Sequence, residues 1–167
     1  PVDEEAHLDR LERSLAELSI AAPMSRAAMK IVVRETLARN RIRNGIVYMQ
    51  VTRGVASREH NYPAGLKPVL VVTARHTDPA RRASVLRDGI SVVTVPDQRW
   101  ARCDIKSISL LPNVLARQAA KDRGVQEAWQ VNADGMVTEG AATNAWIVDS
   151  AGVLRTRPAD AGILNGI

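Results

Sequence analysis

Helical periodicity comes first along this chain, and strand-like periodicity follows it. Four leucines between residues 8 and 18 recur at the spacing of one helix face, which predicts a helix that Asp3 caps and that runs to about residue 20. A second helix is expected over residues 25–39, with Ser25 as the capping residue of its first turn. Because strands are expected after both helices, the order of elements predicts a fold of the α+β class.

The strand-like segments lie on both sides of a change in character near Asp97. Residues 45–52 alternate and are rich in β-branched side chains, and residues 69–74 form an apolar run of the kind that is buried on both faces. The change near Asp97 predicts a boundary between two domains, over residues 1–97 and 98–167. Further expected elements are helices over 81–87 and 113–123, strands over 90–95, 100–105 and 127–131, and strands from 137 onward, over 144–148 and over 153–156, which form a meander.

The composition indicates a chain that forms a packed core. Hydrophobic residues make up 46% of it, and no window approaches about eighteen consecutive apolar residues, so no membrane partner is expected. The single cysteine, Cys103, cannot form an internal disulfide, and no secretory leader is visible, which predicts a cytoplasmic protein. No cluster of His, Cys and Asp has the spacing of metal ligands, so no metal is expected.

The net charge of +5 raises the possibility of a nucleic-acid partner. The arginines, however, are scattered among acids, and only three Trp and two Tyr are present, which leaves no platform for stacking bases. We therefore do not expect nucleic-acid binding. It stays an alternative that a lack of salt-dependent DNA retention would remove.

Lys106 is the residue that most suggests catalysis. Only four of the 23 basic residues are lysine, and Lys106 precedes an apolar run. A lysine amine can lose its proton and attack a carbonyl, whereas an arginine guanidinium stays charged. Composition bias alone could also leave one lysine at this place, so the neighbouring motifs must decide.

Four motifs together resemble one enzyme family. They are Cys-Asp-Ile-Lys-Ser at 103–107, Asn-Val-Leu-Ala at 113–116, Val-Thr-Glu-Gly-Ala-Ala-Thr-Asn at 137–144 and Ile-Leu-Asn-Gly-Ile at 163–167. In this order they are similar to the fold-type IV pyridoxal-phosphate enzymes, and the resemblance extends back to residues 7–10. It implies a two-domain α+β fold, present here as an internal fragment. The fragment would hold a small α/β domain whose start is missing and the first part of a large β-rich domain.

The resemblance implies how the chain would bind pyridoxal phosphate. The Schiff-base lysine of the family falls on Lys106, whose amine would also move the α-proton of the substrate. Glu139 matches the acidic partner of the pyridine nitrogen and would keep that nitrogen protonated. Taken alone, Glu139 would be an ordinary acid of an exposed turn. The full set of expected cofactor contacts is Arg10, Lys106, Glu139, Asn144, Leu164, Gly166 and Ile167.

Three of these contacts come from the two ends of the chain. Arg10 corresponds to an arginine that contacts the cofactor phosphate, although an arginine among acids on a helix is usually a solvated surface pair. Leu164 matches a leucine that packs on the cofactor ring. Ile167 matches a backbone contact to the phosphate at a helix start. His7 shares the Arg10 segment, and we expect a structural role for it.

The polar loop after residue 52 indicates the subfamily. Arg58 and His60 resemble an Arg-x-His pair that D-amino-acid aminotransferases direct at the substrate α-carboxylate from the neighbouring subunit. A guanidinium can bind a carboxylate at two points, which fixes the face of the amino acid that meets the cofactor. The resemblance thus implies transamination of D-amino acids such as D-alanine with 2-oxo acids, in a homodimer. Arg99 and Trp100 are expected to line the same cleft.

Other functions remain open at this point. Aminodeoxychorismate lyase, branched-chain aminotransferases and amine transaminases share the resemblance, and a non-catalytic relative would share the fold. The presence of both Lys106 and Glu139 argues against a non-catalytic relative. Cys103 lies three residues from Lys106 without a nearby histidine, so we expect a small buried side chain there rather than a nucleophile.

Overall fold

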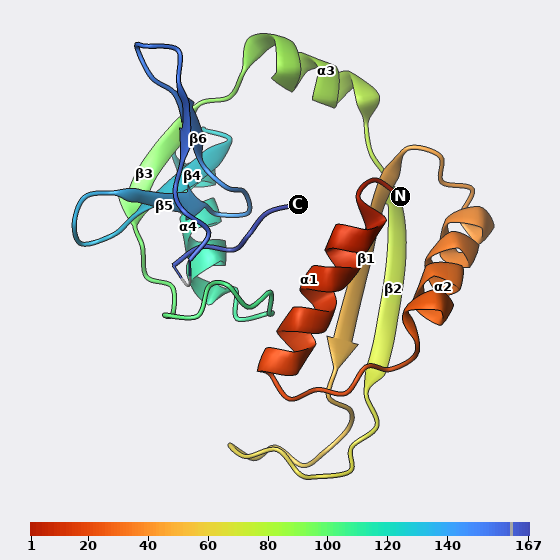
Figure 1. Cartoon of the computed structure of the whole chain (residues 1–167). Helices are drawn as coiled ribbons and strands as arrows, with labels where there is room; N and C mark the ends of the chain where they lie inside the picture. Colours follow the sequence, from red (N-terminus) through yellow and green to blue (C-terminus); the bar gives the residue numbers. More distant parts are fainter. Residues whose placement is uncertain (161) are drawn as a thin grey trace. The chain divides into compact units, whose positions relative to one another are not determined.

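A computed structural model describes residues 1–160 and 162–167, which form two compact units, Pro1–Arg82 and Ala83–Ile167 (Figure 1). The mixture of helices and strands confirms the expected α+β class. Helices are α1 (Glu4–Glu17), α2 (Arg26–Arg39), α3 (Pro79–Asp88) and α4 (Leu111–Asp122). Strands are β1 (Gly45–Thr52), β2 (Val69–His76), β3 (Val92–Pro96), β4 (Glu127–Val131), β5 (Val137–Gly140), β6 (Trp146–Val148) and β7 (Leu154–Thr156).

The first unit links its two helices through ion pairs. Arg26, near the start of α2, donates to Asp9 at 2.5 Å and to Glu12 at 2.6 Å, both on α1. Leu8 and Leu15 of the expected leucine stripe are buried, which confirms the inward face of α1. The Asp9 and Glu12 side chains both reach solvent, so these ion pairs orient the two helices but add little to the stability of the unit.

The two helix starts differ in how they are capped. Ser25 caps α2 as expected, because its Oγ accepts a hydrogen bond from the amide of Ala28 at 3.3 Å. Asp3, expected at the start of the first helix, makes no side-chain cap and has a left-handed backbone with φ of 47°. A capping residue needs an extended backbone to turn its side chain toward the free amides, so the cap expected from Asp3 is wrong.

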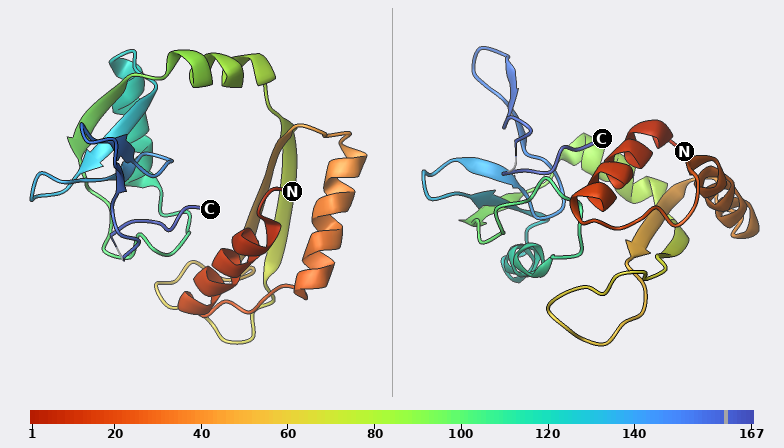
Figure 2. Two further views of the ribbon diagram at one scale, coloured as in Figure 1. Left: turned by 45° about the horizontal axis from the view of Figure 1, so that its top comes forward. Right: turned by 60° about the horizontal axis from the view of Figure 1, so that its bottom comes forward.

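The hairpin of the first unit is an antiparallel pair, β1 with β2, in the register Gly45↔His76 to Thr52↔Val69. Helix α2 packs against β2, and the two lie side by side in both views of Figure 2. The expectation that this second strand is buried on both faces is wrong, because Val69 and Val71 are 45% and 44% exposed. Burial alternates along β2, so the described residues cover only one face of the hairpin.

The second unit is built on a three-stranded sheet in the order β3-β4-β5. Strand β3 runs parallel to β4, and α4 makes the crossover between them and packs on both. Four alanines from α4, β4 and the residue after β5 form the core at this contact: Ala116, Ala120, Ala128 and Ala141. Small side chains let the helix approach the sheet closely.

Two expectations for this unit are corrected. Residues 97–110 contain no strand, although one was expected over 100–105. Arg102 donates to Asp104 at 2.9 Å, and the amide of Ile105 donates to the carbonyl of Arg102, so the segment makes local turn contacts instead of a ladder. The meander is also interrupted, because β6 pairs with β7 in a separate hairpin and not with β5 in the described part of the chain.

The pairing of β3 with β4 also decides where the second unit begins. Because this strand lies before Asp97 and belongs to the sheet of the second unit, the compact units divide at Arg82 and Ala83 rather than near residue 97. No helix in the described ranges is long and apolar enough to cross a membrane.

Substituting Ala120 with leucine is expected to lower the free energy of unfolding by about 1–3 kcal/mol, the usual cost of overpacking a filled core. Ala120 is 1% exposed, so three added carbon atoms have no room. Denaturant titration measures the change. Lys121→Leu on the exposed face of the same helix is the control, and an equal loss in both variants would contradict tight packing under α4.

Candidate functional site

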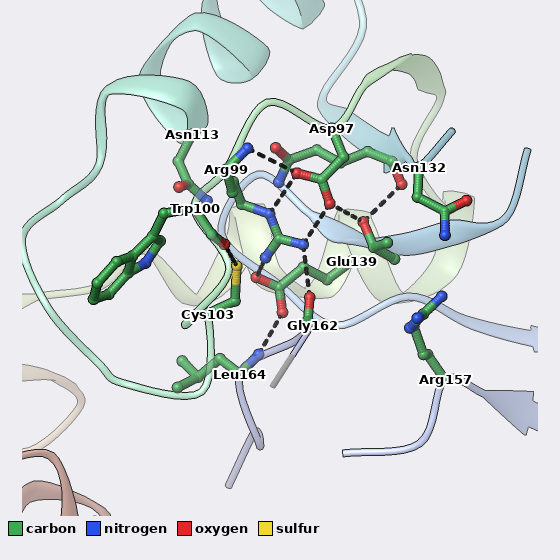
Figure 3. A network of polar contacts seen from close by, with 12 residues as sticks. Asp97, Arg99, Trp100, Cys103, Asn113, Asn132, Glu139, Arg157, Gly162 and Leu164 are labelled. Carbon is green, nitrogen blue, oxygen red and sulfur yellow. Dashed lines mark hydrogen bonds and ion pairs between the residues drawn. The ribbon is translucent and has the colours of Figure 1, made fainter. Parts of the chain in front are cut away.

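Glu139 is the centre of a polar network in the second unit (Figure 3). It lies on β5 and is 8% exposed, which is unusual for a carboxylate. One oxygen, Oε1, accepts a hydrogen bond from Arg99. The other, Oε2, accepts from the amide of Leu164 at 2.9 Å and from Nδ2 of Asn144 at 3.4 Å. Three segments of the unit therefore converge on the buried carboxylate that β5 carries.

Arg99 is more deeply buried than Glu139 and bonds to several groups at once. Its side chain is 4% exposed. The guanidinium donates to Asp97 at 2.9 and 2.7 Å and to the carbonyl of Gly162 at 3.0 Å, besides its contact with Glu139. Figure 3 shows Asp97 and Glu139 on two sides of this guanidinium.

The expected substrate contact from Arg99 is therefore corrected. An arginine that binds a substrate carboxylate needs donors that face an open cleft. The donors of Arg99 instead bond to protein groups in a site closed to solvent. Trp100, expected beside it, is 44% exposed and belongs to the irregular segment that follows β3.

The carboxylates of this network differ in their affinity for protons. Burial alone would raise the pKa of Asp97, but hydrogen bonds from Arg99 and Thr138 outweigh burial and lower that pKa to about 2. Burial raises the pKa of Glu139, and the amide of Leu164 and the charges of Arg99 and Lys106 only partly offset the rise. Asp97 is thus a permanent anion, whereas Glu139 can take up a proton more readily.

Lys106 lies in the irregular segment between β3 and α4 and is exposed. Its neighbour Ile105 is 6% exposed and anchors the segment to the core. The charge of Lys106 favours the anionic form of Glu139, although burial still leaves the pKa of this carboxyl raised. The structure thus brings Lys106 and Glu139 into the same electrostatic environment.

The last residues of the chain are held against Asn144. The amide Nδ2 of Asn144 donates to the carbonyl of Leu164 at 2.8 Å, and Ile163 is buried at 4% exposure. A Cβ on Gly166 would clash with Oδ1 of Asn144, so a side chain at this position would displace the Asn144 amide. Ile167 is 47% exposed. Four of the expected cofactor contacts, Glu139, Asn144, Leu164 and Gly166, are therefore neighbours.

A second buried carboxylate, Glu127 of β4, supports the loop after β5. Its Oε1 accepts from the amide of Ala141 at 3.3 Å, and its Oε2 accepts from Oγ1 of Thr143 at 3.1 Å. Glu127, Asp97 and Thr138 were not among the residues expected at the site. Nothing local marks the contribution of Glu127, because its partners lie 14 and 16 residues away.

The remaining expected contacts lie in the first unit. Nη2 of Arg10 lies 3.3 Å from Nδ1 of His7 on the same helix, and burial lowers the pKa of Arg10. His7, for which a structural role was expected, thus contacts Arg10. Arg58 and His60 are both exposed in the loop that joins β1 to β2.

Arg53 links the start of that loop to α1 and to Tyr62 in the middle of the loop. Its guanidinium donates to the carbonyls of Leu18 and Ser19, just after α1, and is 3.7 Å from the centre of the Tyr62 ring. The cation and the ring attract each other through the ring quadrupole. The segment that carries Arg58 and His60 is therefore fixed to the first unit on either side of them.

Cys103 is partly buried rather than fully buried as expected. Its Sγ donates to the carbonyl of Trp100 at 3.0 Å, and burial raises the pKa of the thiol. A raised pKa disfavours the thiolate, which agrees with the view that Cys103 is no nucleophile.

Comparison with known proteins connects these residues to one family. The sequence profile described as Amino-transferase class IV matches residues 1–167. A D-alanine aminotransferase from Bacillus licheniformis is 42% identical over 162 residues, which are 96% of this chain and 56% of that protein. Another from Staphylococcus haemolyticus is also 42% identical over the same share of both chains.

Solved structures give the same result for the fold. The branched-chain amino acid aminotransferase of Escherichia coli superposes with a TM-score of 0.84 at 22% identity, covering 98% of this chain and 55% of that one. At this identity the likeness concerns the fold alone. The chain spans a little more than half the length of the relatives it matches.

Proposed function

The chain belongs to the class IV aminotransferase family, and on that premise we propose that its protein transfers the amino group of D-amino acids to 2-oxo acids with pyridoxal phosphate. The observation that carries the proposal is the buried Glu139 carboxylate, which Arg99, Asn144 and the amide of Leu164 hold in one orientation. The D-alanine aminotransferases at 42% identity support the choice of substrate class.

The residues present suit this cofactor. A carboxylate offers about four acceptor positions, and the donors from Arg99, Leu164 and Asn144 fill three around Glu139. One position on Oε1 is left for a protonated ring nitrogen. The low-dielectric surroundings of Glu139 strengthen such a contact.

When bound, pyridoxal phosphate supplies an aldehyde that an amine can attack and a ring that draws electrons from the substrate Cα. Lys106 would hold the cofactor through its amine and then carry the proton removed from Cα. Glu139 would keep the ring nitrogen protonated. Lys106 must be neutral to act, and burial beside a ligand would lower its affinity for a proton.

The other contacts would orient the cofactor. Leu164 would pack on the ring, and the backbone at Gly166 and Ile167 would approach the phosphate, where a side chain at residue 166 would clash with Asn144. Arg10 would add a cation for the phosphate. The anion of the cofactor would then meet amides and a guanidinium rather than carboxylates.

Arg58 and His60 would bind the substrate α-carboxylate across the interface of a homodimer. Both are exposed, as a pair that acts on a neighbouring subunit requires. The contacts of Arg53 with Tyr62 and with the end of α1 would limit the loss of freedom on binding.

The test is a coupled assay of the full-length protein with D-alanine and 2-oxoglutarate, run beside L-leucine and aminodeoxychorismate. We expect turnover of D-alanine and a cofactor adduct at Lys106 after borohydride reduction. An adduct with turnover of L-leucine or aminodeoxychorismate alone would keep the family chemistry and overturn the substrate. No adduct would overturn the proposal.

Replacing Arg58 with alanine is expected to raise KM for D-alanine by about 10- to 150-fold, since a charged hydrogen bond contributes about 1.5–3 kcal/mol. Affinity for pyridoxal phosphate should stay unchanged, because Arg58 would touch only substrate. Arg43→Ala, at another exposed arginine of the first unit, is the matched control. Equal KM values in wild type and Arg58→Ala would remove Arg58 from the substrate site.

A further inference from the structure

We infer that Arg99 is a positioning residue, which fixes the Glu139 carboxylate and ties it to the segment 162–164, while Asp97 holds Arg99 in place. The inference deepens the proposed function, since it concerns the same acid. It gives Arg99 a task different from the substrate contact that the sequence suggested.

Asp97 fixes the orientation of the Arg99 guanidinium. Arg99 donates through Nε and Nη2 to the two oxygens of Asp97 at 2.9 and 2.7 Å, which is a two-point contact that sets the plane of the guanidinium. The backbone amide of Arg99 also donates to Asp97, at 3.0 Å. With the plane fixed, Nη1 is directed at Oε1 of Glu139. The orientation of Glu139 therefore depends on Asp97 through Arg99.

Asp97 is itself fixed from the sheet. Oγ1 of Thr138 lies 2.6 Å from Oδ2 of Asp97 and 3.0 Å from the carbonyl oxygen of Gln130, so its proton can be donated to either acceptor. Thr138 precedes Glu139 on β5, so the strand that carries Glu139 also fixes the position of Asp97. The contacts run from Thr138 through Asp97 and Arg99 to Glu139, which is next to Thr138 on the strand. This closed set of contacts leaves the Glu139 carboxylate little freedom to rotate.

Arg99 also balances the charges of the buried Asp97 and Glu139 carboxylates. Two carboxylates and one guanidinium, with 12%, 10% and 4% of their side chains exposed, carry a net charge of −1, from −1 +1 −1. Without Arg99 two anions would lie side by side out of water, and one would take up a proton. Burial already raises the pKa of Glu139, whereas Asp97 would keep its hydrogen bond from Thr138, so the proton would go to Glu139. Arg99 therefore preserves the anionic form that a ring nitrogen needs.

Arg99 and Glu139 both bind the backbone of residues 162–164 near the end of the chain. Nη2 of Arg99 donates to the carbonyl of Gly162 at 3.0 Å, and the amide of Leu164 donates to Glu139 at 2.9 Å. One guanidinium thus sets both the acid and the backbone of the segment proposed to contact the ring. A lysine has a single nitrogen and cannot reach Asp97, Glu139 and Gly162 together.

The test measures the pKa of Glu139 directly, by carbon NMR of the labelled carboxyl in the full-length protein without cofactor. Asp97→Asn with Arg99→Met keeps the net charge of the cluster at −1 and so protects folding. We expect the pKa of Glu139 to rise by at least about one unit, which is tenfold in proton affinity, and Arg99→Lys to give a smaller rise. Arg155→Met, at an exposed arginine paired with Asp149, is the control and should leave the pKa unchanged.

A second readout is the dissociation constant for pyridoxal phosphate, which should increase at least about fivefold in the double variant and stay at the wild-type value in Arg155→Met. An unchanged pKa of Glu139 together with unchanged cofactor affinity would overturn the inference, while turnover of D-alanine by the wild type would still support the proposed function. If the wild type forms no adduct at Lys106, the proposed function fails. The pKa measurement then still decides whether Arg99 controls Glu139.

Discussion

Alanine in place of Lys106 is expected to abolish the borohydride-dependent attachment of pyridoxal phosphate and to lower transamination by about 10²–10⁴-fold, the range for loss of a positioned general acid–base. The residue would have two tasks, to hold the cofactor and to carry the proton from Cα. Neither a methyl group nor a neighbouring side chain replaces an amine at this place. Mass analysis of the reduced protein and the initial rate with D-alanine measure the two losses separately.

The matched variants separate chemistry from charge. Lys106→Arg keeps the positive charge that lowers the pKa of Glu139 but cannot lose its proton, so it should be as inactive as the alanine variant. Lys121→Ala, at an exposed lysine of α4, should retain wild-type attachment and rate. Attachment that persists in Lys106→Ala would show that another amine binds the cofactor.

Elements with a strong local pattern were predictable from the sequence. The leucine spacing of α1, the cap at Ser25 and the alternation of β1 each depend on residues within a few positions. The glycine that follows α4, Gly124, has a φ of 68°, and the expected end of this helix is confirmed there. Local physics decides such elements, so a single sequence is enough.

Elements that depend on distant partners were not predictable. The irregular course of residues 97–110 is set by Arg99, whose partners Glu139 and Gly162 lie 40 and 63 residues further on. A strand was expected over residues 100–105, but Arg102 instead pairs with Asp104 within the segment, and Arg99 pairs with Asp97 just before it. The parallel pairing of β3 with β4 likewise becomes visible only in three dimensions.

The same distinction applies to the site. Lys106 and Glu139 were noticed because their residue types suit the chemistry and their motifs resemble a family. Asp97 and Arg99 lie outside the four motifs, and Thr138 lies within one of them but had no expected role. Arg99 was expected to line the substrate cleft. The sequence therefore named the groups proposed to react, and the structure adds the groups that hold one of them.

Glutamine in place of Glu139 is expected to lower kcat by about 10²–10³-fold, the usual effect of losing one preorganised electrostatic contact. The amide has the same shape, and Arg99 keeps Asp97 as its counter-ion, so the fold should persist. Attachment at Lys106 should also persist, since that step needs only the amine. A loss of kcat without a loss of attachment is the pattern that distinguishes Glu139 from Lys106.

The dependence on pH gives Glu139 a separate signature. Burial raises the pKa of this carboxyl above its ordinary value, despite the opposing effects of the Leu164 amide, Arg99 and Lys106. The anion is the form proposed to hold the ring nitrogen. The kcat of the wild type should therefore have its full value above that pKa and fall as the pH drops through it. Glu139→Gln has no group to titrate there, so its lower kcat should lack this acid limb. An acid limb of the same midpoint in both proteins would assign the titration to another group and remove Glu139 from the ring nitrogen.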